Sequence, residues 1–411
     1  MKLGQHEVMR LLIQLGVMLL AGRVFAELFR KMKQPAVVGE IIAGIILGPT
    51  VFGIFFPDGF HHLFPPGSSW LVLDGFVQVA VVLLLFIAGL EVDLHIVWQQ
   101  GRQAIYTSFF GLAIPFLLGF LFPYYFPSFF GNEDSSIRLA YSLFMGASMA
   151  ITALPVIARI LMDLNIFKSK MGMLVISSAM INDIIGWLIF SVVLGMIGKS
   201  NGNISLWNTV LATVAFTAIA LTLGRGLINR IMPWINLKLA WPGGLLSLSL
   251  AICFLAAAFT EYIGIHAIFG AFLIGITFGD SEHLSERAKE ILHQFINNIF
   301  APLFFVAIGL KVNFSANFDP LLTLAILAIA FAGKLIGSGL GTRLGGFTWR
   351  ESLAAACGMN ARGAMEIILG LVALENKIIN ERVFVSLVIM ALVTSMTSGP
   401  LMKWLLRKRG E

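Results

Sequence analysis

The stretch MGMLVISSAMINDIIGWLIFSVVLGMI, residues 171–197, decides what kind of fold this chain forms. At ~1.5 Å of rise per residue, a helix of this length crosses the ~30 Å hydrocarbon core of a bilayer. Its single ionisable side chain, Asp183, lies near the middle of the run and follows Asn182. A carboxylate at the bilayer centre costs at least ~2.5–3.5 kcal/mol on insertion scales, and such groups usually serve an ion or proton path. The alternative is a structural Asp that is hydrogen-bonded inside the helix bundle.

The composition of the whole chain is typical of a polytopic membrane protein. Of its 411 residues, 58% are hydrophobic and 12% are charged, and the mean hydropathy is +0.89. Soluble domains carry ~25% charged residues. The apolar runs are long and continuous, which favours helices over the short alternating strands of a barrel. The net charge of +6 is scattered over short loops, which argues against a nucleic-acid-binding patch. We expect neither an enzyme nor a bound cofactor.

We predict an all-α membrane protein with about 13 spans, numbered in chain order. They lie at residues 7–29, 36–56, 70–92, 104–127, 138–162, 171–197, 205–228, 243–261, 264–280, 291–312, 320–343, 350–374 and 384–405. An odd number of spans puts the termini on opposite sides of the membrane. With the C-terminus in the cytoplasm, 18 of the 28 lysines and arginines fall inside, as the positive-inside rule requires.

Two of the predicted spans are interrupted by their composition. The fifth contains GASMAITALP, small residues followed by Pro155, and the twelfth contains AAACGMNARGA with the embedded Arg362. If one linker span separates two sets of six, these are the fifth members of two inverted halves. Interrupted helices at matching positions of inverted repeats are typical of secondary transporters, with the ion site between them. The alternative is that glycine and proline are simply common in membrane helices.

Oxygen-bearing side chains occur at the interruptions and in the acidic span. Thr152 lies at the first interruption and Asn360 at the second. Because unwound backbone frees carbonyl oxygens, we expect the Thr152 hydroxyl, nearby carbonyls and the Asp183 carboxylate to bind a hard cation such as Na⁺ or K⁺. Ser177 and Ser178 are weaker candidates, since serines in membrane helices more often form packing hydrogen bonds.

Three of the charged residues within the predicted spans are further candidates for the site. Lys334 is embedded in the eleventh span, and a lone ammonium there needs a partner, for which Asn182 or Asp183 is the obvious choice. Arg362 and Glu366 are four residues apart, so they share a helical face and are expected to pair. Structural pairing and a direct part in gating are the two alternatives for that pair.

Glycines at four-residue spacing predict close helix packing. They occur in the second span (Gly44 and Gly48) and in the eleventh (Gly333, Gly337, Gly341 and Gly345). We interpret both sets as packing contacts rather than as evidence of a dimer.

Seven segments together resemble the monovalent cation:proton antiporter 2 superfamily, and the plant-type cation/H⁺ exchanger branch in particular. They are QPAVVGEIIAGIILGP (34–49), LLLFIAGLEVDL (83–94), ALPVIARIL (153–161), SSAMINDIIGW (177–187), IGIHAIFGAFLIGI (263–276), FAGKLIGSGLG (331–341) and MNARGAMEIIL (359–369). The resemblance implies an elevator motion of a core domain with crossed broken helices, and a homodimer. It makes Asp183 the ion- and proton-binding carboxylate and Lys334 the core lysine. Many members carry a second carboxylate where this chain has Asn182.

On this basis we predict an antiporter of the cell membrane that exchanges Na⁺, or alternatively K⁺, for H⁺. The dimerisation part would comprise residues 7–92 and 243–312, the core part 104–197 and 320–405, and the linker helix 205–228. The ion and proton site would contain Asp183, Asn182, Thr152 and Ser178, and Lys334, Arg362 and Glu366 would supply core charge and gating. A gated cation channel is the rival. So is a K⁺ efflux system regulated by a cytosolic domain after the last span, which would be either absent or trimmed from the sequence that stops at Glu411.

Overall fold

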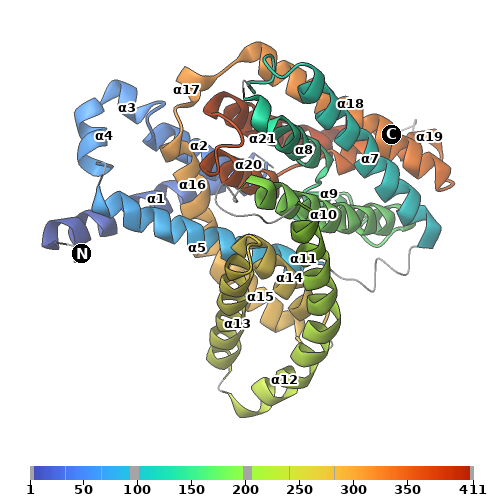
Figure 1. The fold of residues 1–411 in the computed structure, drawn as a ribbon, viewed down its shortest axis with the longest axis horizontal. Helices are drawn as coiled ribbons and strands as arrows, with labels where there is room; N and C mark the ends of the chain where they lie inside the picture. Colours follow the sequence, from blue (N-terminus) through green and yellow to red (C-terminus); the bar gives the residue numbers. More distant parts are fainter. Residues whose placement is uncertain are drawn as a thin grey trace. The chain divides into compact units, whose positions relative to one another are not determined.

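The computed structural model describes residues 4–32, 34–65, 67–92, 101–132, 134–197, 206–239, 241–281 and 283–407. Every regular element within these ranges is helical (Figure 1). Eleven helices of the described part are long and apolar enough to cross a membrane. The chain is therefore a multi-pass helical membrane protein, as its composition predicts.

The number of spans depends on two special elements. The pair α19 (Trp349–Met359) and α20 (Ala364–Glu375) is bent by 46° and raises the number to 12 if it counts as one span. The predicted ninth span corresponds to α14 (Ala267–Gly279), which is apolar but has only 13 residues. At ~1.5 Å per residue such a helix is ~20 Å long, shorter than the hydrocarbon core. The thirteenth span therefore stays a prediction.

Two of the long helices contain a π-turn, which shifts their ends from the predicted positions. The predicted linker continues past residue 228: α11 (Leu206–Ile219) passes through a π-turn at Ala220–Gly224 into α12 (Arg225–Lys238). The second π-turn, Ile296–Phe300, joins α15 (Glu286–Phe295) to α16 (Ala301–Lys311). Pro302 explains the second turn, because it has no N–H to continue the regular hydrogen-bond pattern.

The chain forms two compact units. Unit 1 comprises Met1–Leu90, Gly224–Ala258 and Gly270–Phe318. It includes α1 (Gln5–Lys31), α2 (Ala36–Leu47), the short α3 (Phe52–Phe55) and α4 (Pro57–Leu63), α5 (Ser68–Leu90), most of α13 (Gly243–Tyr262) and the short α17 (Phe314–Asn317). Unit 2 comprises Glu91–Leu223, Phe259–Phe269 and Asp319–Glu411.

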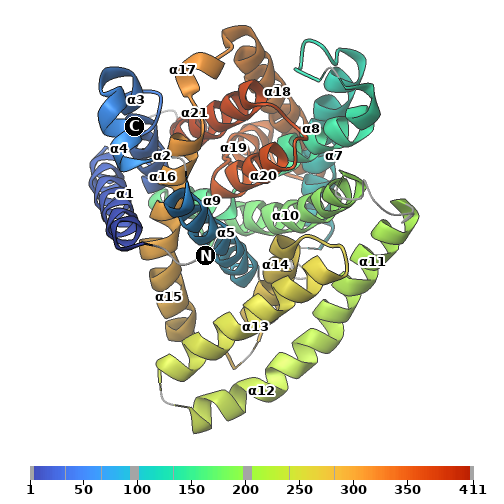
Figure 2. The same cartoon turned by 60° about the vertical axis from the view of Figure 1, so that its left-hand side comes forward.

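Glycines bring α2 against α16 inside unit 1, where α1, α2 and α16 lie together (Figure 2). A Cβ atom built on Gly44 would lie 2.2 Å from the Val306 carbonyl oxygen, and one on Gly48 would lie 2.1 Å from the Gly309 carbonyl oxygen. The spacing of Gly44 and Gly48 therefore serves a contact within one chain, as the packing interpretation predicts.

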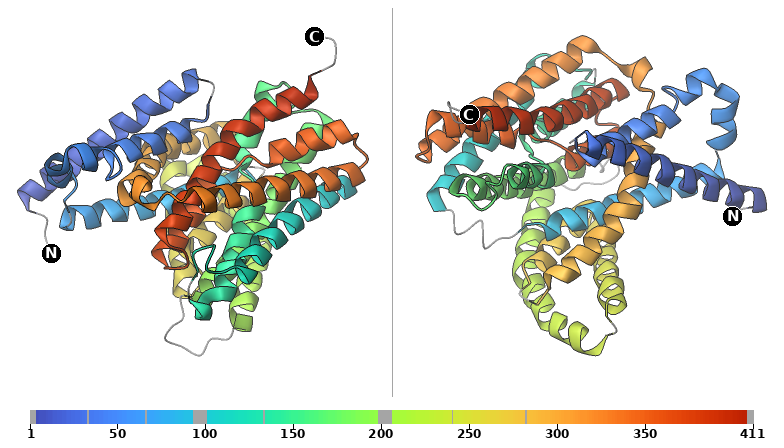
Figure 3. Two further views of the ribbon diagram at one scale, coloured as in Figure 1. Left: turned by 90° about the horizontal axis from the view of Figure 1, so that it is seen from above. Right: turned by 180° about the vertical axis from the view of Figure 1, so that it is seen from behind.

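Unit 2 holds the interrupted helices. It contains α7 (Gly101–Tyr125), α8 (Arg138–Ala150), α9 (Leu154–Asp163), α10 (Lys170–Ile197), α18 (Pro320–Leu344) and α21 (Glu381–Leu406), besides α19 and α20. The teal and green helices α7–α10 lie together with the orange and red helices α18–α21 (Figure 3). Packing thus joins two stretches of unit 2 that are far apart in sequence.

The glycine series of α18 sets the approach of α18 to α7. Cβ atoms built on Gly333, Gly337 and Gly341 would lie 2.7, 2.3 and 2.5 Å from backbone atoms of α7. Gly339, on another face of α18, has no neighbour closer than 3.8 Å. The two helices can approach this closely only because one face of α18 lacks side chains.

We predict that Gly337→Ala lowers the free energy of unfolding by ~1–3 kcal/mol, because the new methyl group overlaps the Phe110 carbonyl. Gly339→Ala is the matched control on the same helix and should be neutral or slightly stabilising. Thermal unfolding of the detergent-solubilised variants measures both effects. Equal melting temperatures for the two variants would contradict the packing role of the series.

Candidate ion-binding site

The first interruption lies between α8 and α9, at residues 151–153. Ile151 and Ala153 both have extended backbone angles. Pro155 gives the physical reason. Proline has no N–H to donate within a helix, so it favours a break, and it fits the first turn of a new helix. Pro115 and Pro123 lie inside α7, so a proline favours a break without enforcing one. The chain therefore ends one helix at Ala150 and starts another at Leu154.

The second interruption, residues 360–363 between α19 and α20, meets the first. The Ala153 N–H donates to the Ala361 carbonyl over 2.9 Å. The Thr152 hydroxyl donates to the Met359 carbonyl over 3.0 Å. Each interruption thus satisfies backbone groups that the other has freed.

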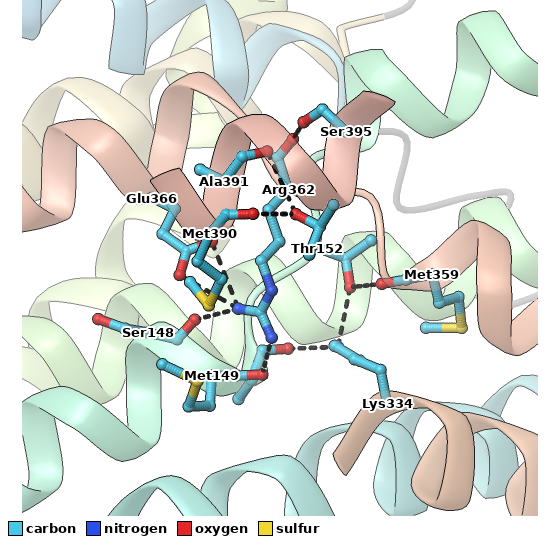
Figure 4. A network of polar contacts seen from close by, with 12 residues as sticks. Ser148, Met149, Thr152, Lys334, Met359, Arg362, Glu366, Met390, Ala391 and Ser395 are labelled. Carbon is cyan, nitrogen blue, oxygen red and sulfur yellow. Dashed lines mark hydrogen bonds and ion pairs between the residues drawn. The ribbon is translucent and has the colours of Figure 1, made fainter. Parts of the chain in front are cut away.

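The interruption of α8 frees the last carbonyl groups of that helix, which two buried cations bind (Figure 4). The Ile151 N–H still donates to the Ala147 carbonyl. The Arg362 guanidinium donates to the next two carbonyl groups, those of Ser148 and Met149, and the Lys334 ammonium donates to that of Ala150. The C-terminus of a helix carries partial negative charge, so these cations stabilise it.

Lys334 has three hydrogen-bond acceptors that the sequence did not indicate. Besides Ala150, its ammonium donates to the Gly111 carbonyl over 3.0 Å and to the Thr152 hydroxyl over 2.9 Å. These contacts use all three donors of an ammonium group, so neither Asn182 nor Asp183 accepts a hydrogen bond from it. Asp183, one of the two partners that the sequence suggested, is an electrostatic neighbour of the ammonium. The reason is that the interruption supplies acceptors that no side-chain pattern reveals.

Arg362 and Glu366 pair, as their spacing predicts. Arg362 Nη1 lies 3.2 Å from Glu366 Oε1, and both side chains are fully buried. Glu366 lies in the first turn of α20, where a carboxylate is favoured by the helix dipole. The Ser395 hydroxyl of α21 donates to the Arg362 carbonyl. The pair therefore links α8, α20 and α21.

Asp183 lies on α10, which packs against the first interruption. A Cβ atom on Gly186, one turn after Asp183, would lie 2.4 Å from the Ile151 side chain. Asp183 is fully buried, and neither carboxylate oxygen has a hydrogen-bond partner among the described residues. Its electrostatic neighbours are the Lys334 ammonium, the Thr152 backbone N–H and the Glu91 carboxylate. A buried carboxylate of this kind needs a proton or a cation to offset its charge.

The remaining predicted residues separate into two groups. The side-chain oxygen and nitrogen of Asn182 are buried and, like the Asp183 oxygens, have no partner within the described ranges. Ser178 instead contacts α7: its hydroxyl lies 3.4 Å from the Ala104 carbonyl, and its own carbonyl accepts from Ser108 over 3.3 Å. Ser178 therefore takes part in helix packing. The sequence predicted that this interruption frees carbonyl groups for a cation, but those of residues 148–150 accept from Arg362 and Lys334 instead. The Thr152 hydroxyl, also expected to bind the cation, contacts Met359 and Lys334.

This arrangement of groups suits a small hard cation. The described part of the chain contains no cluster of three or more His, Cys, Asp or Glu residues that could hold a metal ion. Instead it presents the Asp183 carboxylate and the neutral amides of Asn182 and Asn360, whose buried oxygen atoms have no partner among the described residues. Oxygen atoms are the ligands by which such cations are bound. A monovalent cation or a proton would neutralise Asp183.

Comparison with known proteins agrees with this chemistry. Residues 16–408 match the family model described as sodium/hydrogen exchanger, transmembrane. The chain belongs to the sodium/hydrogen exchanger family. Exchanger relatives are transporters, not enzymes, and this assignment confirms the resemblance that the sequence motifs showed.

Individual relatives differ in length. The exchanger chain is 31% identical to the Na⁺/H⁺ antiporter NhaS4 of Synechocystis over 95% of its own length and 96% of that protein. It is also 31% identical to cation/H⁺ antiporter 17 of Arabidopsis thaliana over 97% of its own length, but spans only 48% of that protein. The solved structure of the sodium proton antiporter MjNhaP1 from Methanocaldococcus jannaschii shares the fold, with a TM-score of 0.60 at 17% identity, over 98% of this chain and 100% of that one.

We predict that Arg362→Met lowers the free energy of unfolding by ~3–5 kcal/mol, because Glu366 is left buried without its partner. Arg159→Met is the matched control: Arg159 and Asp163 have the same spacing, but their side chains are 71% and 70% exposed. That exposed pair should contribute less than ~1 kcal/mol. Thermal unfolding of both variants and of the double variant Arg362→Met/Glu366→Leu tests this. The double variant should recover part of the loss, and no recovery would contradict the explanation.

Proposed function

We propose that this exchanger is an antiporter that exchanges a monovalent cation for H⁺ at one shared site, Asp183. One observation carries the proposal: a fully buried carboxylate without a hydrogen-bond partner in the described residues, on a helix that packs against the crossing of two interrupted helices. Membership of the sodium/hydrogen exchanger family supports it.

Exchange follows from competition for one negative charge. Asp183 binds either a proton or a cation, and each displaces the other. With neither bound, an uncompensated carboxylate would have to cross an apolar barrier, which is costly. Only the protonated and the cation-loaded forms would move, so the two fluxes are coupled.

We propose an elevator motion in which the part that contains the site moves against a part that forms a homodimer. The division of the chain into two compact units supports this, because all the site helices fall in one unit. The proposal retains the predicted core (104–197 and 320–405), dimerisation part (7–92 and 243–312) and linker (205–228). It also retains thirteen spans, the inverted repeats, the cell membrane as location and a cytoplasmic C-terminus, which the distribution of lysine and arginine supports.

Na⁺ is the proposed cation, with K⁺ as the alternative. A relative that this chain matches over nearly its whole length is a Na⁺/H⁺ antiporter. The carboxylate, amide and backbone oxygens near the crossing would bind either ion. Selectivity is measured by comparing Na⁺, K⁺ and Li⁺ at equal concentration in the exchange assay.

We predict that Asp183→Asn abolishes exchange and leaves the protein folded, because a neutral amide cannot carry a proton in exchange for a cation. Proteoliposomes with an internal pH dye, to which Na⁺ or K⁺ is added, measure the activity. Asp163→Asn is the control, since Asp163 is an exposed acid at the end of the interrupted helix and should retain full activity. Cation-driven proton release by Asp183→Asn would refute the site. Cation flux without proton movement in the unaltered protein would instead indicate a channel.

The contacts of Lys334 bear on how many protons move in each cycle. Its ammonium has three acceptors, Gly111, Ala150 and Thr152. A neutral amine has only two N–H groups, so it would lose one of these three contacts. We propose that Lys334 stays charged throughout and that each cation exchanges for one proton.

We therefore predict electroneutral exchange. Recordings on solid-supported membranes should show little steady charge displacement when cation is added to the unaltered protein. Asn182→Asp should change this, because it adds a second titrating carboxylate beside Asp183. A robust current in the unaltered protein that disappears in Lys334→Gln would show that the lysine does release a proton.

A further inference from the structure

Asn360 is a buried residue at the crossing whose side chain the hydrogen-bond network leaves unused. It is the first residue of the second interruption and is 1% exposed. Neither its amide oxygen nor its amide nitrogen has a hydrogen-bond partner within the described ranges. An amide can form up to four hydrogen bonds, and a buried polar group without any costs free energy. The side chain therefore lacks a structural explanation.

The backbone around Asn360 is held on both sides. Its own N–H donates to the Ala356 carbonyl over 3.1 Å. The preceding carbonyl, of Met359, accepts from the Thr152 hydroxyl, and the following one, of Ala361, accepts from the Ala153 N–H. These contacts fix the backbone at Asn360. The missing partners of its side-chain amide are therefore not the result of a loose loop.

Thr152 connects this amide to the acidic residue. Its hydroxyl binds the residue next to Asn360, while its backbone N–H is an electrostatic neighbour of the Asp183 carboxylate. Thr152 thus contacts the backbone directly before Asn360 in the second interruption and faces Asp183 on α10. Asn360 and Asp183 each present buried oxygen atoms that lack a partner among the described residues.

We propose that Asn360 Oδ1 is a neutral ligand of the transported cation, which it shares with Asp183. This inference rests on the proposed antiport function and adds a residue from the second interruption to the site. A cation that leaves water needs several oxygen atoms to replace its hydration shell, whereas a proton needs only the carboxylate. A neutral ligand therefore favours the cation over the proton and preserves the one-to-one balance of charge with Asp183.

The test measures cation binding apart from transport. The purified full chain is unfolded thermally at alkaline pH over a series of NaCl or KCl concentrations, with choline chloride keeping the ionic strength constant. A ligand that binds only the folded state raises the melting temperature as its concentration passes the dissociation constant. Asn360→Ala should raise the half-saturating cation concentration roughly tenfold or more, the effect of losing one contact to a charged group.

Two further variants separate a ligand from a structural residue. Ser352→Ala is the control. It removes another buried side-chain oxygen that has no partner among the described residues, from α19, the helix that ends just before Asn360. It should leave the half-saturating cation concentration unchanged. Asn360→Asp keeps an oxygen at the position and adds charge, so it should bind at least as tightly as the unaltered chain and shift the preference toward Li⁺ and Na⁺ over K⁺. In choline chloride alone, Asn360→Ala should melt no lower than the unaltered chain, because it removes an unsatisfied group.

The possible outcomes distinguish the two proposals. If Asn360→Ala melts lower in choline chloride and keeps the half-saturating cation concentration, the residue is structural and the inference is overturned. An equal loss of affinity in Asn360→Asp and Asn360→Ala would also overturn it. If the unaltered chain shows neither cation-dependent stabilisation nor exchange in liposomes, the proposed antiport function itself fails.

Discussion

The end of α8 is the constraint on which the rest of the site depends. The helix ends before Pro155, so the carbonyl groups of residues 148–150 lose their helical partners. Without other donors these carbonyl groups would be buried and unsatisfied. Arg362 and Lys334 bind them from two other helices. An unsatisfied buried carbonyl and an unpaired buried cation are both costly. The carbonyl groups and the two cations therefore stabilise each other. The result is a buried, hydrogen-bonded contact between the two interruptions, residues 151–153 and 360–363.

In the proposed exchange, the charge of Asp183 is the variable in the site, because both buried cations have fixed partners. Arg362 is paired with Glu366 and held by two carbonyl groups. Lys334 is held by two carbonyl groups and a hydroxyl. Asp183 has no side-chain hydrogen-bond partner among the described residues, and in the proposed exchange a mobile ion or a proton offsets its charge. A buried carboxylate without permanent partners is unfavourable for stability and suitable for binding an exchangeable ion.

Close helix packing keeps these groups in register. The glycine face of α18 allows that helix, which carries Lys334, to lie directly against the backbone of α7. In the same way, Gly186 lets α10 approach the first interruption at Ile151, one turn from Asp183. A side chain at either position would move a charged group relative to the crossing. The small residues are therefore as important to the geometry as the charged ones.

The sequence alone determined what depends on local chemistry and composition. The length of the apolar runs decided the helical membrane fold. Pro155 and the glycines indicated the interruptions, and four-residue spacing predicted the pairing of Arg362 with Glu366. The lone carboxylate in residues 171–197 singled out Asp183, whose part in ion binding stays a proposal. The tertiary structure alone decided the partners of Lys334, the packing role of Ser178 and the unused amide of Asn360. The reason is physical: their partners are backbone groups brought together by residues far apart in the chain, and every residue carries the same backbone groups, so no sequence pattern marks which of them a fold will leave free.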